Sequence, residues 1–186
     1  MLKKTDYLTP GWEDYYKDLN LNNLWCDSNR ILLSKSVNPS FYFSQLELIR
    51  HFIKDKSVKS IVEVGGNFGG LAKELCQDVD AYCFVEIEPM LSFAKKYLNG
   101  DVDFVDAKDI ESIGKFDLFI SNQCLSEVPD TFKKCIYNML PKMKHIFIID
   151  NEIDEKKVSQ THDIHKEPYT DFHYPLTLYF CTRRED

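Results

Sequence analysis

Residues 60–75 form a glycine-rich stretch that reads Ser60-Ile61-Val62-Glu63-Val64-Gly65-Gly66-Asn67-Phe68-Gly69-Gly70-Leu71-Ala72-Lys73-Glu74-Leu75. A β-branched run leads into four glycines within six residues, and a helix-forming run follows at once. That order predicts a strand, a tight loop and the beginning of a helix. In open α/β sheets such a turn brings the backbone close to a nucleotide-like ligand, so this stretch predicts a binding site as well as a fold.

Strand and helix patterns alternate around this stretch. Short apolar runs predict five strands, at 61–64, 81–87, 102–105, 116–121 and 145–149. Helical patterns predict helices at 44–56, 71–77, 89–98 and 130–140. Largely apolar strands that alternate with helices indicate a doubly wound α/β fold, with a mostly parallel sheet and helices on both faces. Aromatic and β-branched runs at 169–174 and 176–182 predict an antiparallel pair, and hence an antiparallel C-terminal edge strand.

The predicted elements divide the chain into two parts of one compact unit. Residues 1–56 are irregular at first and helical later, which predicts an N-terminal helical cover segment. Residues 57–186 carry the alternating strands and helices and are the expected ligand-binding domain. A length of 186 residues with 44% hydrophobic residues is sufficient for the core of such a unit.

Composition and charge exclude several classes of protein. The formal net charge of -7 argues against a nucleic-acid partner, because phosphate backbones attract basic surfaces. Apolar runs are too short to span a bilayer, so no membrane partner is expected. Six cysteines are scattered with no C-x-x-C pair, which argues against zinc and redox motifs. We expect a cytoplasmic protein with reduced thiols.

A carboxylate at the end of the second predicted strand completes the expected site. Glu86 lies twenty-one residues after Gly65, where a carboxylate accepts both ribose hydroxyls of an adenosine cofactor. Nicotinamide dinucleotides and S-adenosylmethionine share this device. The dinucleotide fingerprint requires glycine at position 67, which is Asn67. Glu63 is unexpected in a buried strand, and we interpret it as holding the loop or attracting a cationic amino-acid end of the ligand.

These residues resemble the class I S-adenosylmethionine-dependent methyltransferases, whose first motif is E/D-x-G-x-G-x-G. The resemblance covers about residues 57–151 and implies a Rossmann-like domain that binds S-adenosylmethionine. Asn67 stands where the family has its middle glycine, and asparagine tolerates a left-handed backbone better than most residues. The cofactor-binding residues that the resemblance implies, from loop to ribose to adenine to methyl group, are Glu63, Gly65, Gly66, Asn67, Phe68, Gly69, Glu86, Ile87, Asp106, Ala107, Ser121 and Asn122.

A narrower part of the sequence resembles the sugar O-methyltransferases. Residues 65–72 are similar to that group's glycine-aromatic-glycine-glycine loop, with Asn67 in place of its first glycine. Residues 119–128 are similar to the stretch after its fourth strand, which carries a Ser-Glu dipeptide, here Ser126-Glu127. This resemblance implies methylation of a hydroxyl group on a sugar or another small polar acceptor.

A sugar hydroxyl is a poor nucleophile and benefits from a base or a metal ion. The candidate catalytic residues are Glu127, His162 and His165. The non-catalytic alternatives are that Glu127 is a carboxylate that stabilises a helix start, and that the two histidines are surface residues in the loop after the fifth strand. Asp150-Asn151 resembles the pair in magnesium-dependent members of the family. Those members also have an aspartate where Ser121-Asn122 stands here, so we expect no metal site.

Two other functions stay open. An N- or protein methyltransferase would share the fold, although an Asn/Asp-Pro-Pro-Tyr signature typical of base methylation is absent from the fourth strand. A catalytically degenerate S-adenosylmethionine-binding module would explain Asn67 and the lack of an obvious base. The main prediction is an S-adenosylmethionine-dependent O-methyltransferase.

Overall fold

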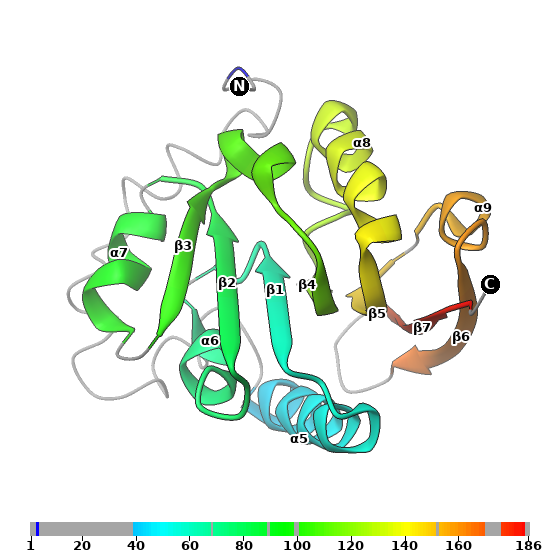
Figure 1. Cartoon of the computed structure of the whole chain (residues 1–186), viewed down its shortest axis with the longest axis horizontal. Coiled ribbons are helices and arrows are strands. Elements are labelled where there is room, and N and C mark those ends of the chain that lie inside the picture. The colour runs from blue at the N-terminus through cyan, green and yellow to red at the C-terminus, as the bar shows by residue number, and fades with distance from the viewer. Residues whose placement is uncertain are drawn as a thin grey trace.

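A computed structural model describes residues 3, 39–67, 69–88, 90–98, 101–151, 153–169 and 176–184 (Figure 1). Within these residues no helix is both long and apolar enough to cross a membrane. In chain order the elements are α5 (Pro39–Lys56), β1 (Ser60–Val64), α6 (Gly70–Leu75), β2 (Ala81–Glu86), α7 (Met90–Tyr97), β3 (Val102–Asp106), the 3₁₀ helix η1 (Ala107–Ser112), β4 (Phe116–Asn122), α8 (Asp130–Met139), the 3₁₀ helix η2 (Leu140–Lys142), β5 (Met143–Asp150), α9 (Glu155–Val158), β6 (His162–Tyr169) and β7 (Leu176–Arg183).

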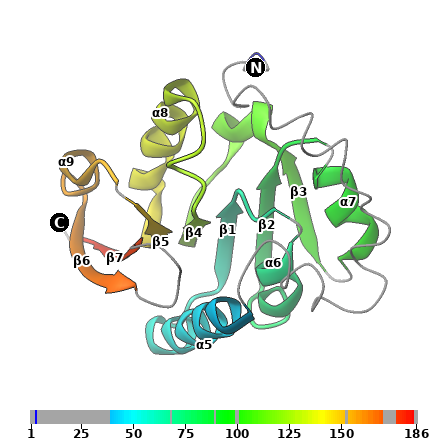
Figure 2. The ribbon, with the colours of Figure 1, turned by 180° about the vertical axis from the view of Figure 1, so that it is seen from behind.

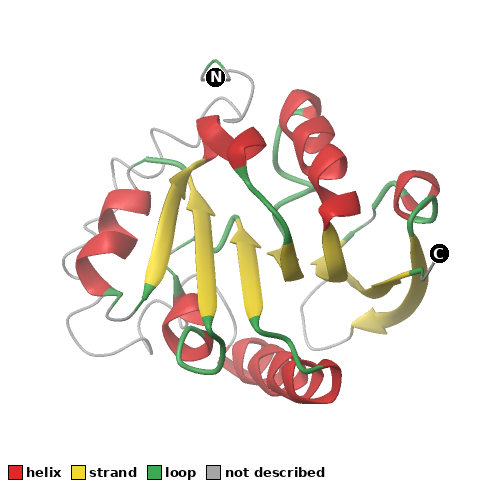
Figure 3. Ribbon diagram, in the orientation of Figure 1, coloured by secondary structure: helices red, strands yellow, loops and turns green. Residues whose placement is uncertain are grey.

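The described strands form one seven-stranded sheet in the order β3-β2-β1-β4-β5-β7-β6. Strands β1 to β5 are parallel, whereas β7 is antiparallel to β5 and β6 is antiparallel to β7. Figure 3 shows the strands as a twisted layer with helices around it. The predicted doubly wound α/β fold, mostly parallel with antiparallel C-terminal strands, is confirmed.

Each face of the sheet has its own apolar cluster, because successive strand residues point to opposite faces. Ile61, Phe84 and Ile120 pack with α5, α6 and α7 on one face. Val62 and Phe119 pack with η1, α8 and α9 on the other face. The opposite views in Figures 1 and 2 show these two helical layers. The core therefore lies on both sides of the parallel strands, as the apolar runs predict.

Three element boundaries matter for the site. Strand β3 extends to Asp106 and β4 to Asn122, so both residues end a strand. Strand β6 begins at His162, seven residues before the predicted 169–174 strand, and it is the edge strand, since β7 lies between β5 and β6. The expected loop around His162 and His165 is therefore a strand, and that part of the prediction was wrong.

Helix α5 runs along the sheet with its N-terminal half near the carboxyl ends of the strands. Its Gln45 bonds Asn122, the last residue of β4. Seven residues later, the Phe52 ring packs edge-on against His145, near the start of β5, with the ring centroids 5.3 Å apart. Apart from Lys3, the part of the predicted cover segment that precedes α5 lies outside the described residues, so its covering role stays a prediction.

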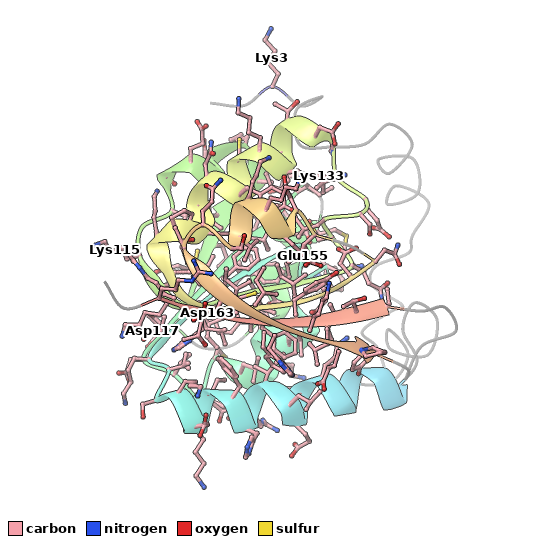
Figure 4. All side chains as sticks on the ribbon, turned by 90° about the vertical axis from the view of Figure 1, so that its right-hand side faces the viewer. Lys3, Lys115, Asp117, Lys133, Glu155 and Asp163 are labelled. Atoms are coloured by element: carbon pink, nitrogen blue, oxygen red, sulfur yellow. The ribbon has the colours of Figure 1, made fainter. Side chains whose placement is uncertain are left out.

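Asp117 fastens β1 to β4 at the amino-terminal edge of the sheet (Figure 4). Its Oδ2 accepts hydrogen bonds from the N–H groups of Lys59 and Ser60 at 2.8 and 3.1 Å. Its Oδ1 lies 2.8 Å from Lys144 Nζ. Burial alone would raise the pKa of Asp117, but the bonds from Lys144, Lys59 and Ser60 lower it below the ordinary value of 3.8.

We expect Asp117→Asn to lower the free energy of unfolding at pH 7 by about 1–2 kcal/mol, since a charged acceptor is lost. A lowered folded pKa stabilises the protein above the unfolded value of 3.8, and that stability is lost as the pH falls through the folded pKa. The difference between variant and wild type should therefore shrink below about pH 4. Urea unfolding at pH 7 and pH 3 measures it, and an equal difference at both values would contradict the assignment.

Candidate functional site

The carboxyl ends of the parallel strands bring the predicted residues together at one edge of the sheet. Strand β1 has β2 on one side and β4 on the other, so the order of the strands reverses at β1. Ligands of open α/β sheets bind in the crevice at such a point. Glu86 of β2 and Asp106 of β3 are register partners, and Asn122 ends β4 on the other side of β1.

The glycine loop after β1 adopts the left-handed conformation at three positions. The φ angles are 74° at Gly65, 55° at Asn67 and 76° at Gly69. The prediction that Asn67 tolerates such a backbone is confirmed. A Cβ atom at Gly65 would overlap the Cys124 side chain, which lies in the turn after β4. The loop therefore needs glycine at Gly65 for both its backbone angle and its packing. Phe68 lies outside the described residues.

Glu86 ties this loop to the end of β2. Its carboxylate accepts hydrogen bonds from Asn67 N at 2.7 Å and from Ile87 N at 2.8 Å, one on each oxygen. Only 7% of the residue is exposed. Burial raises the pKa of Glu86 to about 7, although the two N–H groups oppose the rise. Each oxygen has further lone-pair capacity, so the carboxylate is able to accept two hydroxyl groups of a ligand.

Glu63 lies beneath the loop. Tyr82 donates its hydroxyl proton to Glu63 Oε2 at 2.8 Å, and a Cβ atom at Gly66 would lie 2.6 Å from Glu63 Cδ. Burial raises the pKa of Glu63 to about 7; the Tyr82 hydroxyl lowers it and the Glu86 carboxylate raises it further. This position supports the interpretation that Glu63 holds the loop.

The end of β3 carries a second acidic residue. Asp106 caps η1 by accepting from Lys108 N at 3.0 Å, and its Oδ2 lies 3.0 Å from Lys108 Nζ. Ala107 is buried at the start of η1, and Ile87 is half-buried directly after β2. These residues form the β2–β3 side of the crevice.

The turn after β4 carries Glu127. Glu127 N donates to Cys124 O at 3.0 Å, and Ser126 N donates to Asp150 Oδ2 at 3.2 Å. Asp150 is fully buried and also accepts from Asn151 N at 2.8 Å. Partial removal from water and the Asp150 carboxylate raise the pKa of Glu127. Asp150 thus holds the turn that places Glu127 at the edge of the crevice.

Asp150 accepts a backbone N–H group at each of its oxygens, so it caps the end of β5. In the described part of the chain, no three His, Cys, Asp or Glu side chains come together as they would to hold a metal ion.

The two predicted catalytic histidines do not join this site. His162 is fully buried, and its Nε2 lies 3.1 Å from Met143 O at the start of β5, the opposite end of the parallel strands. Burial lowers the pKa of His162. His165 is exposed on β6 opposite Phe180 of β7, two strands away from β5. The loop expected after β5 is instead the edge strand, which places both histidines outside the crevice.

Ser121 and Asn122 are the last two residues of β4, which is one residue longer than the predicted 116–121 strand, and Ser121 is fully buried. Asn122 Nδ2 donates to Gln45 Oε1 at 2.9 Å. The sequence prediction missed Gln45, a buried polar residue of α5. A signal was present, because Gln45 lies four residues before Ile49 on the apolar side of the predicted helix.

No protein-family model and no curated protein sequence matches the chain. Solved structures match it in shape. The N-methyltransferase NodS from Bradyrhizobium japonicum WM9, in complex with S-adenosyl-L-homocysteine, is 14% identical over 89% of this chain and 97% of its own, with a TM-score of 0.67. Magnesium protoporphyrin IX methyltransferase from Synechocystis PCC 6803, with bound S-adenosylmethionine, is 14% identical over 78% and 81%, with a TM-score of 0.63.

The methyltransferase domain of bacterial Hen1 is 9% identical over 77% of this chain and 98% of its own, with a TM-score of 0.64. The chain has the fold of the class I methyltransferases. These identities are too low to carry a substrate or a ligand from one methyltransferase-fold protein to another.

We expect Gly65→Ala to lower the free energy of unfolding by about 2–4 kcal/mol, because the new Cβ meets Cys124 in a left-handed backbone. Gly114→Ala is the matched control, since nothing lies within 4 Å of a Cβ there. Urea unfolding measures both variants. Equal, small effects at the two positions would contradict the packing of the loop on Cys124.

A second prediction concerns the pH dependence of stability. The folded pKa of Glu63 is about 7, above its ordinary value of 4.5, so the folded state keeps the proton up to a higher pH than the unfolded state does. Stability should fall as the pH rises from about 4.5 to 7. The Glu63→Gln variant has no buried carboxyl group to ionise. Its free energy of unfolding relative to wild type should therefore rise by about 1–3 kcal/mol between pH 4.5 and pH 7.

Urea unfolding of the ligand-free protein at pH 5 and pH 7.5 checks this expectation, with the exposed Glu88→Gln as control. A stability difference between Glu63→Gln and wild type that stays constant with pH would show that Glu63 is already ionised at pH 5.

Proposed function

We propose that this chain is a methyltransferase that binds S-adenosylmethionine at the carboxyl ends of β1, β2 and β3 and methylates a hydroxyl group of a small polar acceptor of the sugar class. The observation that carries the proposal is the Glu86 carboxylate, which meets the loop through Asn67 N at 2.7 Å. This hydrogen bond brings the proposed ribose-binding acid and the glycine loop together at one place in the crevice. Two solved neighbours hold S-adenosylmethionine or S-adenosyl-L-homocysteine, which supports the same ligand here.

The residues present fit this ligand. Glu86 is positioned to accept the two ribose hydroxyls, and Asp106 with Ala107 lies on the next strand for the adenine ring. Gly65, Gly66 and Gly69 keep the loop compact beside the amino-acid end, since a Cβ atom at each of them would press on a neighbouring side chain. Asn67 Oδ1 is buried and has no hydrogen-bond partner among the described residues, as expected of a group that meets a bound molecule.

S-adenosylmethionine supplies an electrophilic methyl group on a sulfonium centre, so the protein's main contribution is to position the acceptor. A hydroxyl acceptor must also lose its proton. Glu127 is the proposed proton acceptor, because partial burial and the nearby Asp150 carboxylate raise its pKa and make it more basic. With His162 and His165 away from the crevice, no described histidine serves this role in the proposal.

The acceptor is proposed from the sequence, since the fold serves many acceptors. Residues 119–128 resemble the sugar O-methyltransferases and carry Ser126-Glu127 in the turn beside the crevice. The second candidate function is methyl transfer to nitrogen. It is supported by the similarity in shape to the N-methyltransferase NodS, with a TM-score of 0.67. A panel of sugars, nucleotide sugars and amines with a labelled methyl donor distinguishes the two.

Titration calorimetry with S-adenosyl-L-homocysteine tests the cofactor part of the proposal. We expect Glu86→Gln to weaken binding about tenfold to a hundredfold, because a charged hydrogen-bond acceptor for the ribose is lost. Glu88→Gln is the matched control, since Glu88 lies two residues further along in an exposed turn and undergoes the same change of charge. Wild-type binding with an unaffected Glu86→Gln variant would contradict the assignment of Glu86. No binding by the wild type would overturn the methyltransferase proposal.

A further inference from the structure

A pair of side-chain amides joins α5 to the end of β4 and remains half satisfied. Asn122 Nδ2 donates to Gln45 Oε1 at 2.9 Å, across 77 residues of sequence. The other two polar atoms of the pair, Gln45 Nε2 and Asn122 Oδ1, are buried and have no hydrogen-bond partner among the described residues. The pair therefore presents one donor and one acceptor that are both buried and unused.

This inventory does not depend on how the amide groups are oriented. If both amides were rotated by 180°, Gln45 would donate to Asn122, and the unused atoms would be Gln45 Oε1 and Asn122 Nδ2. Either arrangement leaves one amide NH₂ group and one amide carbonyl oxygen unused on the two neighbouring side chains. Buried polar atoms without partners are costly, and they point to a ligand when they cluster at a site.

The pair lies on the side of the crevice that the cofactor's adenosine half does not need. Glu86 and Asp106 are on β2 and β3, on one side of β1. Asn122 ends β4 on the other side of β1, and Gln45 approaches it from α5. A ligand that spans the switch point would place its adenosine over β2 and β3 and its reacting end toward β4.

We propose that Gln45 and Asn122 form the subsite for the acceptor hydroxyl, in which one amide N–H donates to the hydroxyl oxygen and one amide carbonyl accepts a hydrogen bond from the bound hydroxyl group. The proton leaves this hydrogen bond and is transferred to Glu127 when the oxygen is methylated. This inference rests on the proposed methyltransferase function. Gln45 and Asn122 are positioning residues in it, because neither takes the proton. Their effect is to fix the direction of the hydroxyl oxygen.

The donor–acceptor pair also selects the chemistry of the acceptor. A hydroxyl group is both a donor and an acceptor and so satisfies both unused atoms. An ammonium group has only donors and leaves the amide N–H unpaired, whereas a carboxylate has only acceptors and leaves the amide carbonyl unpaired. A site built to bond a hydroxyl discriminates strongly against groups that leave its buried polar atoms unpaired.

The test begins with Gln45→Glu, which keeps the acceptor for Asn122 Nδ2 and removes the unused N–H. Gln77→Glu is the matched control for charge, because Gln77 is exposed in the turn after α6 and outside the crevice. The acceptors are methyl α-D-glucopyranoside, methyl α-D-mannopyranoside and UDP-glucose, with D-glucosamine as the amine probe. Two quantities are measured for each variant: the dissociation constant for S-adenosyl-L-homocysteine, and KM and kcat for the best hydroxyl acceptor.

We expect Gln45→Glu to keep the dissociation constant within about twofold of wild type and to raise KM for the hydroxyl acceptor at least about tenfold. Gln77→Glu should match wild type in both. An unchanged KM in Gln45→Glu would overturn the proposal, and so would a parallel loss of cofactor affinity, which would place the pair in the cofactor site. Wild-type binding of cofactor without transfer to any hydroxyl acceptor would contradict a hydroxyl subsite. No cofactor binding by the wild type would refute the proposed function itself.

The double variant Gln45→Met, Asn122→Leu tests the alternative that the amide pair only fastens α5 to the sheet. Removing both amides eliminates their unpaired atoms, so we expect the ligand-free protein to keep or raise its midpoint of thermal unfolding. The same variant should still bind S-adenosyl-L-homocysteine and lose methyl transfer. A clear fall in the unfolding midpoint would show that the pair serves to fasten α5 to the sheet and would overturn the proposal.

Discussion

The Glu86 carboxylate is the point at which the sheet and the loop depend on each other. Its oxygens accept the N–H groups of Asn67 and Ile87, so the end of β2 holds the turn that follows β1. The turn keeps its shape only with left-handed angles at Gly65, Asn67 and Gly69. Glu63 lies beneath the same turn with the Tyr82 hydroxyl. Two buried carboxyl groups with pKa values of about 7 therefore lie at the centre of the crevice.

The parallel half of the fold could be predicted because its signals are local. Short apolar runs that alternate with helical patterns specify β1 to β5, and the acids at 86 and 106 lie at the ends of predicted strands. The left-handed backbone at Asn67 was also predictable, since few residues other than glycine and asparagine accept a φ angle of 55°. The left-handed backbone at Asn67 removes one reason to regard the chain as a degenerate binding module.

The rest depends on tertiary contacts that no local pattern reports. The polar residues 162–168 lack the apolar pattern of a strand. They form β6 because their backbone pairs with the free edge of β7. His162 is buried with its Nε2 beside Met143 O at the start of β5, a partner that the neighbouring sequence does not reveal. Gln45 meets Asn122 across 77 residues, so its sequence position indicates burial but not its partner.

The most direct test of the cofactor site is a crystal structure of the wild-type protein with S-adenosyl-L-homocysteine. The account predicts the ribose hydroxyls within hydrogen-bond distance of the Glu86 carboxylate, the adenine beside Asp106, and the homocysteine end over the loop that begins at Gly65. The sulfur should face the turn between Asn122 and Glu127. A ligand found away from the carboxyl ends of β1 and β2, or with its ribose clear of Glu86, would contradict the account.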